Sequence, residues 1–218
     1  MKGLLIKDFK LLKNQKQFFI IMLIVSLLIG FGMGEPSFII SYLTVLLSLF
    51  ATSTISYDTY DNGMPFLFTL PISRKIYVGE KYVFGLLDML ISLTVSCILA
   101  VFGYVVKGQS FDHGELFFLV VSTFCIVTLM LSLSLPIQLK FGPEKSRFAL
   151  LLSYGICFAL IFGLFSLLKS AGVDTDALLT NLSSASPLLF CLGALLLCGA
   201  AGVISYLASL KIMEKKEF

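Results

Sequence analysis

Six stretches of this chain contain no Asp, Glu, Lys or Arg, and their lengths constrain the fold more than any other feature. A helix needs about 20 apolar residues to cross the ~30 Å hydrocarbon core of a bilayer. Allowing for polar residues at their ends, the stretches predict spans near residues 18–34, 36–57, 82–106, 116–137, 148–168 and 187–210. Each is apolar all round, which is typical of helices and not of barrel strands. We therefore expect an all-α integral membrane protein, with one six-helix domain over 18–210 and a tail at 211–218.

The composition supports this reading. Hydrophobic residues make up 58% of the chain and charged residues only 13%, against about 45–50% and about 25% in soluble domains. So few charges cannot coat a globule, which argues against a soluble enzyme. The high hydrophobicity also argues against a disordered chain.

The basic residues predict the orientation. Of the 16, all but Lys107 and Lys169 lie at the N-terminus, in the second or fourth connection, or after the last span. In a six-span chain these four places share one side of the membrane, and basic residues accumulate on the cytoplasmic side. Both termini are therefore predicted in the cytoplasm. The net charge of +3 is then a matter of topology, and no nucleic-acid partner is expected.

Residues 1–17 are predicted to form an amphipathic helix. Four lysines, at 7, 10, 13 and 16, sweep one side of it, and four leucines, at 4, 5, 11 and 12, gather on the other. Asp8 interrupts the leucine arc, and Ile6 and Phe9 fall among the lysines. Such a helix can lie in the inner interface with its lysines on anionic headgroups. The alternative is a solvated basic segment that only sets the topology.

The second connection, 58–81, is the longest predicted cytoplasmic segment. Its middle, 65–71, is strongly apolar but far too short to span. Asn62-Gly63 indicates a turn, and Pro71 followed by Ser73 indicates the end of one helix and the cap of the next. A short apolar helix on this face must be covered. It either folds back against the bundle or fills a groove on a partner protein.

Few other residues suggest chemistry. The sequence has no hydrolase triad, nucleotide-binding loop or metal-ligand spacing, and the five cysteines all fall inside predicted spans. We therefore expect no enzymatic activity, metal or cofactor in this chain. Asp88 stands in a hydrophobic context. It either pairs with a basic residue or water near the inner interface, or takes part in substrate passage.

Three segments resemble a known family. Residues 66–81 (FLFTLPISRKIYVGEK) are similar to the first cytoplasmic loop of small six-span type-2 ABC transporter permeases, and 135–147 (LPIQLKFGPEKSR) to the second. The opening MKGLLIKDFK is similar to their basic N-terminal helix. Within the family, the chain most resembles the membrane subunits that export phenol-soluble modulins, which are amphipathic peptide toxins.

The resemblance implies that 58–81 contains a coupling helix that docks on a separate ATPase subunit. It assigns apolar plugs to Phe66, Leu67 and Leu70, polar contacts to Asp58, Asp61, Arg74 and Lys81, and the turns to Asn62, Gly63, Pro71 and Ser73. A more peripheral contact would come from Lys140, Gly142, Glu144, Lys145 and Arg147. ATP and magnesium would bind to the partner, and two permeases, identical or paralogous, would join two ATPases.

The resulting prediction is the transmembrane subunit of an ATP-driven exporter in a bacterial cell membrane, with amphipathic peptides as cargo. Two alternatives remain at this stage. One is an ATP-independent secondary transporter, and the other is a structural or immunity membrane protein without transport.

Overall fold

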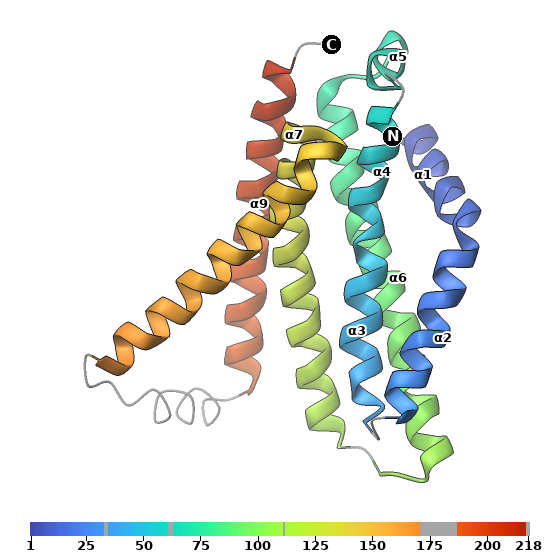
Figure 1. Cartoon of the computed structure of the whole chain (residues 1–218), viewed down its shortest axis with the longest axis vertical. Coiled ribbons are helices and arrows are strands. Elements are labelled where there is room, and N and C mark those ends of the chain that lie inside the picture. Colours follow the sequence, from blue (N-terminus) through green and yellow to red (C-terminus); the bar gives the residue numbers. More distant parts are fainter. Residues whose placement is uncertain (33–34, 61–62, 111, 171–186, 217–218) are drawn as a thin grey trace.

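A computed structural model describes residues 1–32, 35–60, 63–110, 112–170 and 187–216, with only some of the side chains in 143–170 and none in 187–190 (Figure 1). In the described part of the chain, all regular secondary structure is helical, and there is no strand. They are α1 (Lys2–Asn14), α2 (Lys16–Gly32), α3 (Ser37–Ser48), α4 (Phe50–Thr59), α5 (Gly63–Thr69), α6 (Arg74–Lys107), α7 (His113–Ser170) and α9 (Pro187–Lys215).

Four segments of the described chain are long and apolar enough to cross a membrane: Ser37–Thr59, Arg74–Lys107, His113–Gly142 and Cys191–Lys215. The helices α1 and α2, bent by 61° at their junction, could together supply a fifth. The chain therefore has the helices of a multi-pass membrane protein. The expected span at 148–168 coincides with the second limb of α7, and the count of six stays a prediction.

The bundle is organised around α3. Ile39, Ile40 and Leu43 on this helix are fully buried and pack with Ala100 of α6. A second group of buried side chains continues this core along α4, α6 and α7: Phe50, Ala51, Phe84, Met89, Val127 and Leu131. Since every one of these helices is apolar on its outer side as well, packing at these specific positions, and not hydrophobicity alone, sets which face turns inward.

The two ends of the bundle differ. The start of α1, the end of α9, helix α5 and the reversal within α7 all lie at one end in Figure 1, and the connections after α2 and α6 lie at the other. The basic N-terminal and C-terminal segments therefore share an end with both loops singled out in the sequence. We call this the α5 end. Lys107, one of the two exceptional basic residues, lies at the opposite end.

The reversal in α7 occurs at a single residue. Gly142 has φ 72° and ψ −176°, while the chain on either side is helical. Only glycine adopts this region without strain, because it has no Cβ. The predicted fourth connection is thus a sharp kink and not an extended loop.

Replacing this glycine should destabilise the fold through its backbone alone. An added Cβ at Gly142 would meet no atom within 4 Å, and neither would one at the helical Gly163, which makes Gly163→Ala a matched control. We expect Gly142→Ala to lower the free energy of unfolding by about 1–3 kcal/mol, whereas Gly163→Ala should be neutral or stabilising. Circular dichroism during unfolding of the detergent-solubilised chain measures both. Equal stability of the two variants would contradict this account of the kink.

Candidate functional site

Helix α5 has two faces of different character. Met64 is buried, and Leu67 and Phe68 pack beside it against the bundle. On the other face Phe66 is 71% exposed, and Leu70, the residue directly after the helix, is 47% exposed. The apolar segment was expected either to fold back against the bundle or to fill a groove on a partner, and the face that carries Met64 and Phe68 does fold back against the bundle. The second face, Phe66 and Leu70, is open, and we call it the α5 outer face.

The ends of α4, α6 and α9, and α7 just before its kink, pack against α5. The buried cluster around Met64 includes Ile55 of α4, Tyr77 and Val78 of α6, Leu135 and Leu139 of α7, and Met213 of α9. Phe68 adds an edge-to-face contact with Tyr77, at 5.8 Å between ring centroids. A displacement of α5 would therefore press on α4, α6, α7 and α9 at once.

Two local devices fix the turns around α5. The hydroxyl of Ser73 accepts a hydrogen bond from the backbone N–H of Ile76 at 3.3 Å and so caps α6, as the sequence predicted. At Gly63 a Cβ would lie 2.8 Å from the carbonyl oxygen of Asp58, so the chain needs glycine to turn this closely. Pro71, between the two helices, is exposed.

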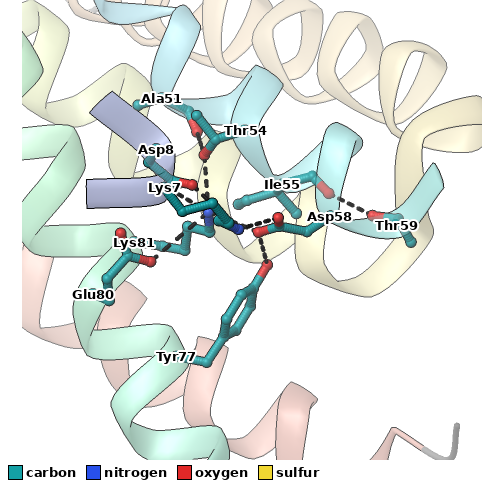
Figure 2. Close-up of polar contacts among 10 residues, drawn as sticks. All are labelled: Lys7, Asp8, Ala51, Thr54, Ile55, Asp58, Thr59, Tyr77, Glu80 and Lys81. Carbon is teal, nitrogen blue, oxygen red and sulfur yellow. Dashed lines mark hydrogen bonds and ion pairs between the residues drawn. The ribbon is translucent and has the colours of Figure 1, made fainter. Parts of the chain in front are cut away.

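A cluster of ionisable side chains lies beside α5, where α1, α4 and α6 meet (Figure 2). Its centre is Lys81, which is completely buried. The Lys81 ammonium lies 2.5 Å from Asp8 Oδ2 and 2.8 Å from Asp58 Oδ2, and it donates to the Thr54 hydroxyl at 3.1 Å. Burying an ammonium is tolerated only when such partners replace water.

The cluster joins three helices through Asp58. Its carboxylate pairs with Lys7 of α1 and with Lys81 of α6, and it accepts a hydrogen bond of 3.0 Å from the hydroxyl of Tyr77. Lys7 also lies 3.2 Å from Asp8. We refer to Lys7, Asp8, Asp58, Glu80 and Lys81 together as the ion cluster. It holds α1 against α4 and α6, the helices that precede and follow α5.

Several residues assigned to the docking surface lie elsewhere. Asp58 and Lys81 are turned inward and neutralise each other instead of reaching the surface. Arg74 donates to the backbone carbonyls of Met213 and Glu214, at 2.9 and 2.6 Å, at the C-terminal end of α9. A guanidinium is favourable there because helix C-terminal carbonyls lack helical partners. Asp61 and Asn62 lie outside the described residues.

The second predicted contact region lies at the same end of the bundle. Lys140 and Lys145 are exposed, and the Lys140 ammonium lies 5.1 Å from the ring centroid of Phe141. Gly142 forms the kink between them. The side chains of Glu144 and Arg147 lie outside the described residues.

Asp88, on α6, is buried against the start of α4, where its carboxyl group faces the backbone N–H of Ala51. A carboxyl group at a helix N-terminus is favourable because the first N–H groups lack helical partners. Its second oxygen, Oδ2, has no hydrogen-bond partner in the described part of the chain. Asp88 therefore marks the junction of α3 and α4.

Sequence reasoning missed most of the ion cluster. Lys7, Asp8 and Glu80 were not assigned to any site, and neither was Tyr77, which donates to Asp58. One signal was present, since Asp8 interrupts an otherwise apolar arc of α1. A carboxylate on a face that packs against a bundle requires a buried cation, and Lys81 is that cation.

Removing the central ammonium should destabilise the protein strongly. Lys81→Met leaves Asp8 buried with only the neighbouring Lys7 as a cationic partner, and we expect a loss of about 3–5 kcal/mol in the free energy of unfolding. Lys75→Met, at an exposed position two helical turns earlier, should change it by less than about 0.5 kcal/mol. Unfolding of the solubilised chain measures both. Similar stability of the two variants would show that the cluster does not hold α1.

Comparison with known proteins places the chain in a family. The model of a family described as ABC-2 family transporter protein matches residues 3–214. No curated protein and no solved structure gave a match. The match covers α1 through α9, including the ion cluster and the α5 outer face. The chain therefore belongs to the ABC-2 family of transporter membrane proteins.

Proposed function

We propose that this chain is the transmembrane subunit of an ATP-driven exporter and that the α5 outer face docks on an ABC ATPase subunit. The observation that carries the proposal is a pair of exposed apolar side chains, Phe66 on α5 and Leu70 directly after it, while the other face of the helix is packed. Exposed apolar groups beside a helix face that is packed against its own protein are typical of a helix-in-groove contact with a partner. Family membership supports an ATPase partner.

In this proposal the chain converts a movement of its partner into a movement of its spans. ATP and Mg²⁺ bind on the ATPase subunits, and this chain supplies no catalytic group. When two ATPases close, each would push an α5. Because α5 packs against the ends of α4, α6 and α9 and against α7 just before its kink, the push reaches the spans without passing through a flexible loop. Two permease subunits would form the complete transporter.

We propose an amphipathic peptide as cargo. Supporting this, a groove of about 620 Å³ runs between α6, α7 and α9. Apolar side chains dominate its lining, among them Leu86, Leu131, Leu135, Leu195 and Val203. Its polar groups are few, and Tyr82 uses its hydroxyl on Ser205 and Ser209, at 2.5 and 2.8 Å. Such a surface suits an apolar side of a peptide better than a small polar solute.

Charged substitutions on the α5 outer face should abolish binding of the ATPase. Phe66→Glu and Leu70→Glu place a carboxylate where the proposal requires an apolar plug, and desolvating it is costly. We expect at least a tenfold loss of the ATPase that co-purifies with the solubilised chain from membranes that contain both.

The control for this experiment is Ile76→Glu, which makes the same chemical change at an exposed apolar position in the first turns of α6. It should retain the ATPase. If both Phe66→Glu and Leu70→Glu retain it as well, α5 is not the docking helix. If the unaltered chain never retains an ATPase, the exporter proposal itself fails, and a secondary transporter or a structural or immunity protein becomes the better hypothesis.

The orientation can be tested with single cysteines. With the α5 end in the cytoplasm, a cysteine at Ser110 should react with a membrane-impermeant maleimide on intact cells. One at Thr69 should react only after permeabilisation. Both positions are exposed, whereas the described native cysteines are buried or half-buried. The unaltered chain gives the background, and the reverse pattern would invert the topology.

A further inference from the structure

Glu80 is the one member of the ion cluster that the contacts described so far leave unexplained. It is completely buried, and neither carboxyl oxygen has a hydrogen-bond partner among the described residues. Its nearest cation is the Lys81 ammonium, 3.8 Å from Oε2 (Figure 2). Asp8 Oδ1 is likewise buried without a hydrogen bond in the described chain. Unsatisfied buried oxygens of this kind are rare, and each calls for an explanation.

The charges in the cluster do not balance. Lys7 and Lys81 carry two positive charges, whereas Asp8, Asp58 and Glu80 carry three negative charges when all are ionised. The titratable groups that act on Glu80 are Lys7 and Asp8 from α1 and Tyr77 and Lys81 from α6. Asp58 of α4 faces Lys81 from the other side. The excess is therefore one negative charge, and two of the three carboxyl groups that share it, those of Asp8 and Glu80, are completely buried, which is strongly unfavourable.

We propose that the ion cluster is a binding site for one proton, carried by Glu80 and donated in a hydrogen bond to Asp8 Oδ1. This single proton accounts for both observations. Two carboxylates then face two ammonium groups, and the orphaned oxygens of Glu80 and Asp8 become partners. Two carboxyl groups that share a site commonly keep one proton between them for this reason. A metal ion fits less well, since the described residues contain no group of ligands able to hold one.

The proposed proton would help to hold α1 in place. Asp8 lies on α1 and Glu80 on α6, so a hydrogen bond between them would link the N-terminal helix to α6, the helix that follows α5. In the unfolded chain an exposed glutamate has a pKa near 4.3 and has lost its proton at neutral pH. Folding therefore takes up a proton, and stability must fall as the pH rises from about 4.3 until folded Glu80 also loses its proton.

Glu80→Gln tests this directly. Glutamine cannot ionise, yet its amide N–H can donate to Asp8 Oδ1 as the protonated acid would. In the full chain at pH 7, the infrared carbonyl band of a buried protonated carboxyl group should be present and should lose intensity in E80Q. The exposed Glu115→Gln is the matched control and should leave the band unchanged. Asp88, a second buried acid, contributes equally to both spectra and cancels in the difference.

Unfolding between pH 5 and pH 9 provides the second readout. The unfolding equilibrium constant of the unaltered chain should rise by up to about tenfold per pH unit while folded Glu80 keeps its proton and the unfolded glutamate has lost its own, and should level off once folded Glu80 ionises. E80Q should lack this component. The proposal is overturned if E80Q keeps the full carboxyl band or the full pH dependence. It is also overturned if E80Q does not fold, because a neutral hydrogen-bond donor at position 80 is what the proposal requires.

Discussion

An ammonium group buried away from water has to be surrounded by compensating charge, and the burial of Lys81 imposes this requirement on three helices at once. Asp58 meets it from α4, Asp8 from α1, and Thr54 adds a neutral oxygen. Because Asp58 also binds Lys7 and Tyr77, the start of α6 cannot shift relative to α1 or α4 without breaking several ionic contacts. Helices with apolar surfaces all round can slide against one another at little cost, and the ion cluster removes that freedom at the α5 end.

The α5 end therefore combines a rigid support with an open apolar surface. The support consists of the buried contacts of Met64, Leu67 and Phe68 and of the ion cluster beside them. The open surface is Phe66 and Leu70. This division suits a subunit that receives force, since a docking helix on a flexible loop would absorb a push instead of transmitting it. Membership in the ABC-2 family gives the proposed force a source in a separate chain.

The sequence predicted the helical class, most element positions and the short apolar helix, because these follow from local patterns. Ser73 as a cap and Asn62-Gly63 as a turn signal are properties of a few adjacent residues. The pairing of Asp8 with Lys81 joins positions 73 residues apart, and no local pattern carries that information. For the same reason Asp58, Arg74 and Lys81 were expected on the docking surface. Their charges indicated partners but not that those partners lie within this chain.

The position of the chain ends has a practical consequence for handling this protein. The first turns of α1 adjoin the ion cluster, and the last turns of α9 receive Arg74 beside the α5 support. An affinity tag attached at either end would therefore stand next to the surface that is proposed to bind the ATPase. The short connection after α6, at the far end of the bundle (Figure 1), is the place for an epitope that leaves that surface free.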